Sequence, residues 1–183
     1  QQALLIRNKT LNARIETLES KPSFKDVSFK RGILFVDGFF EFKHEKNRKI
    51  PHFIFNDNPI GIGTILSEWI NPSTGEIIST FSIVTHKASN VLKSIHNNPK
   101  LPEPRMPLIL SRESQEEWLT LENQGSILEK QFTHLANAVK DVSLLAHEVR
   151  PIRGKSASAT NEEAWKPIPT QSSLFWDASV KVC

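Results

Sequence analysis

The middle of the chain alternates apolar or aromatic runs with short polar breaks, and this pattern restricts the fold more than any other feature of the sequence. The runs are rich in isoleucine, valine, phenylalanine and threonine, which favour strands. They cover residues 32–42, 50–55, 60–70 and 76–85. The breaks, at residues 44–49, 56–59 and 71–75, hold asparagine, proline, glycine or clustered charges. Strands joined by such short connections predict an antiparallel meander that curls into a sheet or barrel.

Outside this meander the sequence predicts short helices and one further strand. Helices are expected over residues 23–30, 88–95 and 126–139, and in a segment that begins at Ser111. A loop is expected over the proline-rich residues 97–104, a strand over 106–110, and either a strand or a helix over 142–149. The predicted fold class is therefore α+β: a curled antiparallel or mixed sheet with a barrel-like core, flanked by short helices.

The chain is predicted to form one domain over residues 1–183, in which residues 154–183 are a tail that packs on the domain or is flexible. Its 183 residues, 38% hydrophobic and 23% charged, fit a globular protein. A net charge of +3 permits nucleic-acid binding without requiring it. The single cysteine, Cys183, excludes an internal disulfide framework and a zinc site of several thiolates.

No apolar run approaches the roughly 20 residues that span a bilayer, and no signal-peptide pattern is present. A cytoplasmic protein without a membrane partner is expected. Because the first residue is Gln1 and not methionine, we also expect that the sequence is not a whole translation product.

Two polar side chains stand in an otherwise apolar segment near the start of the chain. Asn12 and Arg14 alternate with Leu11, Ala13 and Ile15, so in an extended segment they share one face. An amide beside a guanidinium suits a phosphate together with a carbonyl or hydroxyl group. On this motif alone, a polar pair that satisfies backbone groups is the commoner role.

A carboxylate and an imidazole could move protons. Glu41 lies among Phe39, Phe40 and Phe42, either on the solvated face of a strand or in a partly apolar pocket where it could shuttle protons. His96 follows a predicted helix, where it could cap carbonyl groups or act as an acid or base. Taken singly, each is more often structural. The other five histidines lack metal-ligand spacing, so no metal site is predicted.

Taken together, these motifs resemble the SOS response-associated peptidase (SRAP) family. The resemblance extends from about Lys9 to Leu110. It rests on Asn12-Ala-Arg-x-Glu-Thr17, Lys21-Pro-Ser-Phe24, Asp37-Gly-Phe-Phe-Glu41, Phe81-Ser-Ile-Val-Thr85, His96 and Arg105-Met-Pro-Leu-Ile-Leu110.

The resemblance implies recognition of abasic sites in single-stranded DNA and formation of a covalent protein–DNA crosslink. It implies that Asn12 positions the reacting amine or sugar, that Glu41 assists proton transfer, and that His96 acts as acid and base. It implies that Arg14 and Arg105 hold phosphates beside the lesion. The family is also described as a peptidase. No metal or cofactor is implied, and a monomer is favoured.

The sequence departs from the family pattern in three places. The family's nucleophile, an N-terminal cysteine that supplies an amine and a thiol, has no counterpart here, and Cys183 at the far end is not assumed to replace it. Residues 97–104 separate His96 from the Arg-Met-Pro motif. Phe40 and Phe42 stand where tyrosine and tryptophan are common.

Three functional hypotheses follow. The first is a DNA-repair enzyme domain whose nucleophile lies outside this chain. The second is a module that binds single-stranded or damaged DNA without chemistry, and the third is a β-rich interaction domain. The first requires that Glu41 and His96 converge, together with Asn12, around one pocket.

Overall fold

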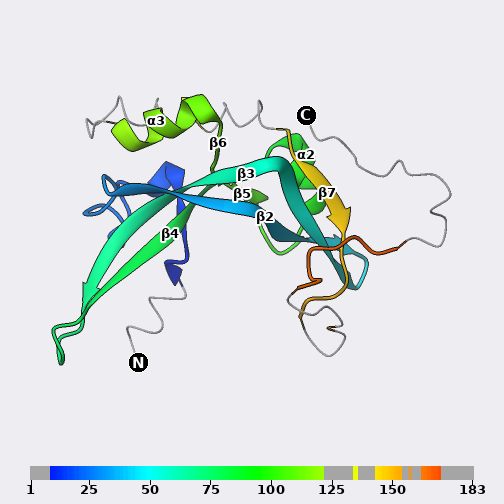
Figure 1. Ribbon diagram of the computed structural model, residues 1–183, viewed down its shortest axis with the longest axis horizontal. Coiled ribbons are helices and arrows are strands. Elements are labelled where there is room, and N and C mark those ends of the chain that lie inside the picture. Colours follow the sequence, from blue (N-terminus) through cyan, green and yellow to red (C-terminus); the bar gives the residue numbers. More distant parts are fainter. Residues whose placement is uncertain (1–8, 122–133, 136–142, 154–156, 158–161, 170–183) are drawn as a thin grey trace. The chain divides into compact units, whose positions relative to one another are not determined.

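A computed structural model describes residues 9–121, 134–135, 143–153, 157 and 162–169 (Figure 1). The chain divides into two compact units. Unit 1 comprises Gln1–Phe35, Gly61–His86 and Pro107–Val142, and unit 2 comprises Val36–Ile60, Lys87–Met106 and Ser143–Cys183. Two long strands, β2 (Arg31–Glu45) and β3 (Arg48–Ile70), contribute residues to both units.

The sheet is mixed. Strand β1 (Asn12–Arg14) pairs in parallel with β4 (Ile77–Lys87), whereas β3 and β4 are antiparallel. Figure 1 shows β3 and β4 side by side as a long hairpin, which Gly75 closes with a φ of 72° that suits glycine. The strand order β1-β4-β3-β2 is an open path. The prediction of a mixed sheet with short helices is confirmed.

Strand β3 corrects one predicted break. Residues 56–59 were expected to end a strand, but β3 continues through them from Arg48 to Ile70. Proline favours extended backbone in the residue before it, so Asn58-Pro59 is compatible with an uninterrupted strand. Residues 57–59 are also exposed, so polar side chains there cost little. The preceding break is a turn of Lys46 and Asn47 between β2 and β3, narrower than the expected residues 44–49.

The strand predicted at residues 106–110 is divided into β5 (Arg105–Pro107) and β6 (Ile109–Leu110). Leu108 explains the division. Its backbone N donates to Val84 O on β4 at 2.8 Å, and its O accepts from Gly63 N on β3 at 2.8 Å. The backbone therefore changes partner strand at this residue, which a run of apolar letters cannot reveal.

The helices are short. A 3-10 turn η1 (Ile15–Thr17) follows β1, α2 (Asn90–Ile95) lies within the predicted 88–95, and α3 (Arg112–Thr120) begins after Ser111 as predicted. Ser111 is the N-cap of α3, since its Oγ accepts from Ser114 N at 3.2 Å. Within the described residues, no helix is long and apolar enough to cross a membrane.

The helix predicted over residues 23–30 is wrong. The segment forms successive turns, in which Phe24 N donates to Lys21 O and Val27 N donates to Phe24 O. Lys25 N also donates to Lys21 O, four residues earlier, but the bonds that follow join residues three apart, so no continuous helix forms. The helix predicted over residues 126–139 lies outside the described residues, apart from residues 134–135.

Trp118 on α3 is the centre of the unit 1 core and is fully buried. Its Nε1 donates to Gly32 O at 2.9 Å, and the Arg31 guanidinium lies 5.5 Å from its ring. Arg31 Nη1 donates in turn to Leu121 O at 2.5 Å. Apolar neighbours in this core include Ala13, Ile15, Leu18, Phe24, Ile62, Ile65, Val84, Leu108, Ile109 and Leu110.

In unit 2, β7 (Leu145–Glu148) pairs antiparallel with β3. Of the strand and the helix expected for residues 142–149, the structure therefore has the strand. The pairing supports an aromatic cluster centred on Phe53, whose ring centroid lies 5.3 Å from Phe40 and 6.4 Å from Trp165. His147 is 5.9 Å from Phe53, and its Nε2 is 2.7 Å from Trp165 O. The unit therefore presents half-buried aromatic side chains around a small apolar core.

Candidate functional site

Glu41 and His96 meet in unit 2. Oε2 of Glu41 lies 2.8 Å from Nδ1 of His96, and each side chain is 19% exposed. The contact has ion-pair distance but lacks the alignment of a ring hydrogen bond. Within the part of the chain that the structure describes, Nε2 of His96 is buried and has no hydrogen-bond partner. A carboxylate and an imidazole at this distance can exchange a proton.

Glu41 is held by strand β2. Its Oε1 accepts from the backbone N of Phe42 at 2.9 Å, which leaves Oε2 directed to His96. Gly38, earlier on the same strand, allows β2 to approach β3 closely, because a Cβ at this position would lie 2.4 Å from Ile54 O and 2.4 Å from Phe53 Cζ. The Asp-Gly-Phe-Phe-Glu motif thus couples a close strand pairing to the placement of the carboxylate.

His96 is held by the end of helix α2. It is the C-cap residue, and its backbone N donates to Leu92 O at 2.7 Å. Leu92 and Ile95 are buried and anchor the helix in unit 2. The helix thus fixes the backbone from which the imidazole reaches Glu41. The C-cap position expected from the sequence and the acid–base role are compatible in this geometry.

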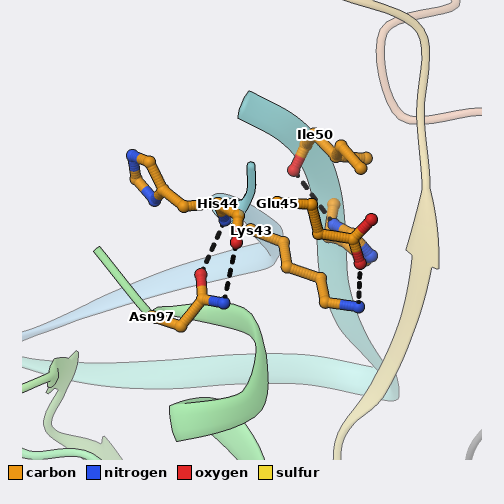
Figure 2. Close-up of polar contacts among 6 residues, drawn as sticks. Lys43, His44, Glu45, Ile50 and Asn97 are labelled. Atoms are coloured by element: carbon orange, nitrogen blue, oxygen red, sulfur yellow. Dashed lines mark hydrogen bonds and ion pairs between the residues drawn. The ribbon is translucent and has the colours of Figure 1, made fainter. Parts of the chain in front are cut away.

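Asn97, the next residue, fastens the end of α2 to β2 (Figure 2). Its Oδ1 accepts from the backbone N of His44 at 2.6 Å, and its Nδ2 donates to the backbone O of His44 at 3.0 Å. The sequence analysis assigned Asn97 only to a loop. Its position directly after His96 was a sign of a possible role, but a single sequence does not identify the strand to which its side-chain amide bonds.

Further polar contacts of β2 and β3 lie beside the bonds between Asn97 and His44 (Figure 2). Lys43 Nζ is 2.6 Å from Glu45 Oε1, and the hydrogen bond from the Lys43 ammonium lowers the pKa of Glu45. Nδ1 of His52 lies 3.1 Å from Ile50 O. Among the described residues, no three histidine, cysteine, aspartate or glutamate side chains are grouped to hold a metal ion.

Arg105 also belongs to unit 2. It is the first residue of β5 and is half-buried. The chain reaches it through Pro104, whose O accepts from Ala88 N at 3.0 Å, while Ser89 N lies 3.3 Å from the Sδ atom of Met106. These contacts place Arg105 near the start of α2, whereas His96 follows its end. That Arg105 holds a phosphate stays a prediction.

Asn12 and Arg14 lie on β1 in unit 1. Both are exposed and Ala13 between them is fully buried, so the predicted alternation, with both polar residues on one face, is confirmed. Their backbone pairs with β4 opposite Ile83 and Thr85. The prediction that Asn12 shares a pocket with Glu41 and His96 stays a prediction.

A protein-family model matches most of the chain. The model described as SOS response associated peptidase (SRAP) matches residues 1–154. Among solved structures, a protein from Bacteroides thetaiotaomicron has a TM-score of 0.73 and 28% sequence identity, covering 92% of this chain and 70% of that chain.

Curated relatives carry a common description. The abasic site processing protein YobE of Bacillus subtilis is 37% identical over 119 residues, which are 63% of this chain and 51% of the relative. The abasic site processing protein YedK of Escherichia coli is 36% identical over 118 residues, which are 63% of this chain and 49% of the relative. The chain thus spans about half the length of the curated relatives it matches.

Proposed function

The chain belongs to the SOS response associated peptidase family, and on that premise we propose that it binds abasic sites in DNA and promotes their covalent capture. The relatives named above are described as abasic site processing proteins. The proposal takes single-stranded DNA as the partner and a monomer acting in the cytoplasm without metal or cofactor. Peptidase activity at the same site is part of it.

One observation carries the chemical part of the proposal: the 2.8 Å contact between Glu41 Oε2 and His96 Nδ1. An abasic sugar in its open form carries an aldehyde. A neutral amine attacks the aldehyde carbon, the nitrogen releases one proton, and the aldehyde oxygen takes one proton, which gives a neutral carbinolamine. That hydroxyl then takes a second proton and leaves as water, while the nitrogen loses a proton and an imine forms. Each step needs an acid or a base beside the reacting atoms.

Glu41 and His96 can supply both functions. The carboxylate accepts the proton that the attacking nitrogen releases, and the protonated imidazole donates to the departing hydroxyl. The amine and the thiol that closes a ring on the imine are those of the N-terminal cysteine that the family resemblance implies. The thiol proton then moves to the imine nitrogen, so a thiazolidine forms with loss of one water overall.

DNA would be held by side chains outside this pair. We assign to Arg14 and Arg105 the phosphates beside the lesion, and to Asn12 the reacting sugar or amine. Arginine suits this task because its planar guanidinium binds phosphate oxygens in a bidentate manner. The half-buried aromatic cluster of unit 2 offers surfaces on which bases can stack.

The experiment is a crosslinking assay with the protein expressed from its complete gene. Single-stranded oligonucleotides with and without one abasic site are incubated with the protein, and the covalent product is resolved by denaturing electrophoresis. We expect product only with the abasic strand, and a loss of about 10²–10⁴ in rate for His96→Ala. Product formed by His96→Ala at the wild-type rate would rule out the proposed chemistry.

The alternative, a module that binds without chemistry, is tested by the same materials. It predicts salt-sensitive binding of the strand that survives His96→Ala and no covalent product with any protein variant. Binding without product would favour this module over the enzyme.

A further inference from the structure

We propose that Asn97 is a positioning residue for the reaction, because it fixes His96 against Glu41. This inference rests on the proposed function of the Glu41–His96 pair. The side-chain amide of Asn97 uses both of its ends on one residue of β2, accepting from His44 N at 2.6 Å and donating to His44 O at 3.0 Å (Figure 2). We call these two hydrogen bonds the Asn97 clasp.

The clasp imitates a strand neighbour. Paired residues of antiparallel strands exchange an N–H and a C=O bond with each other, and here one side-chain amide makes both bonds to His44. Asn97 therefore occupies a sheet-like pairing position on β2 although it lies outside every strand. A side chain with only an acceptor, or only a donor, can make one of the two bonds.

Along the chain, each residue of the clasp lies close to one residue of the Glu41–His96 pair. Asn97 follows His96 directly, and His44 is on the same strand as Glu41. His44 lies three positions after Glu41 on the strand, a rigid span of about 10 Å. Fixing Asn97 on His44 therefore restricts the position of the His96 backbone with respect to the Glu41 carboxylate.

The site needs such a restraint. Helix α2 has only six residues, a length at which a helix depends on tertiary contacts. It is followed by a loop with three prolines at positions 99, 102 and 104. The Glu41–His96 contact lacks hydrogen-bond alignment, so it cannot by itself set the orientation of the imidazole.

Hydrogen exchange tests the clasp without reference to activity. The His44 amide bonds to Asn97 Oδ1, so Asn97→Ala should raise its exchange rate by about tenfold or more and shift the His96 ring signals in NMR spectra. Asn98→Ala is the matched control, because Asn98 Oδ1 accepts from Lys100 N, inside the same loop. Unchanged His96 ring signals in Asn97→Ala would overturn the proposal.

Crosslinking kinetics test the consequence. We expect Asn97→Ala to lower the rate about ten- to a hundredfold, since small misplacements of reacting groups have effects of this size. Affinity for the abasic strand should change by no more than about twofold. Asn97→Asp keeps the acceptor but sets a carboxylate oxygen against His44 O, so its rate should lie between those of wild type and Asn97→Ala.

A double-mutant cycle separates positioning from a general structural role. In a His96→Ala background, Asn97→Ala should cause no further loss, because it acts through the imidazole. A further tenfold loss would mean that Asn97 acts independently of His96 and would overturn the proposal. If Asn97→Ala reacts at the wild-type rate while His96→Ala does not, positioning is wrong and the proposed function stands. If both react at the wild-type rate, the proposed function is wrong, and the His96 ring signals alone decide the clasp.

Discussion

Strand β2 contributes a charged residue to each unit, and the two residues are used in different ways. Arg31 in unit 1 is buried, its Nη1 donates to Leu121 O, and its guanidinium lies over Trp118. Burial lowers its pKa, yet arginine stays charged at any working pH. Glu41 in unit 2 is 19% exposed and faces an imidazole that is equally exposed.

The two residues differ in whether their polar atoms remain available for further interactions. Arg31 and Trp118 donate hydrogen bonds to backbone carbonyls of their own unit. These bonds connect α3 to the start of β2. The Glu41–His96 pair keeps partial exposure, and among the described residues neither ring nitrogen of His96 makes a hydrogen bond. Polar groups that are engaged in hydrogen bonds stabilise a core, whereas ionisable groups that lack such bonds are available to a substrate. The comparison predicts large stability effects in the first region and large rate effects in the second.

The largest expected change in stability is that of Trp118→Ala. It removes a fully buried ring, its hydrogen bond to Gly32 O and its contact with the Arg31 guanidinium, so we expect a loss of about 3–5 kcal/mol in the free energy of unfolding. Urea denaturation followed by circular dichroism measures it. Leu119→Ala, at a half-exposed neighbour on the same helix, is the control and should change stability far less. A Trp118→Ala loss no larger than the control's would break the comparison.

The next effect is that of Gly38→Ala on β2. Because the added Cβ would meet Ile54 O at 2.4 Å, the backbones of β2 and β3 must separate, and we expect a loss of about 1–3 kcal/mol. Gly32→Ala on the same strand is the matched control, since its Cβ would meet only side-chain atoms of Leu66 and Thr64 at 3.1 Å. Equal losses for the two variants would show that the close approach at Gly38 is unimportant.

A smaller effect is expected at the cap of α3. Ser111→Ala removes the bond to Ser114 N and should reduce stability by about 1 kcal/mol. Ser79→Ala, at an exposed position on β4, should leave stability unchanged in the same denaturation experiment. A neutral Ser111→Ala would mean that α3 is held by Trp118 alone.

The smallest effect is a pH dependence. The pKa of Glu113 is lowered, first by its own backbone N–H and then by the Ser111 hydroxyl. Since the pKa in the folded state is the lower one, the carboxylate stabilises the fold above the ordinary glutamate pKa of about 4.3, and this contribution is lost as the pH falls through the folded value. Glu113→Gln should reduce the stability difference between pH 7 and pH 3. An unchanged difference would contradict the assignment.

The sequence predicted local patterns well and long-range partners poorly. The strand runs, the Asn71–Gly75 turn and the helix that starts at Ser111 each depend on residues near one another, and all three are confirmed. The break at residues 56–59 was wrong because strand pairing and exposure, which are not local, decide whether Pro59 is tolerated. The helix predicted over residues 23–30 was also wrong, since the structure has successive turns there.

At the candidate site, too, local patterns were predicted and long-range partners were not. Glu41 and His96 were selected from motif and residue type, and the structure brings them to 2.8 Å. Asn97 was missed, since its role depends on a backbone group on β2 that lies 53 positions away in the sequence. Trp118 and Arg31 were not recognised as partners either, for the same reason.

The central claim is that Glu41 and His96 act as one proton-transfer unit. The most direct test measures the rate of crosslinking to an abasic single strand for wild type, Glu41→Gln, His96→Ala and the double variant, with unfolding measured on the same samples. We expect each single variant to lose about 10²–10⁴ in rate while remaining folded, and the double variant to lose no more than the slower single variant. Losses that multiply in the double variant, or single variants that react at the wild-type rate, would contradict it.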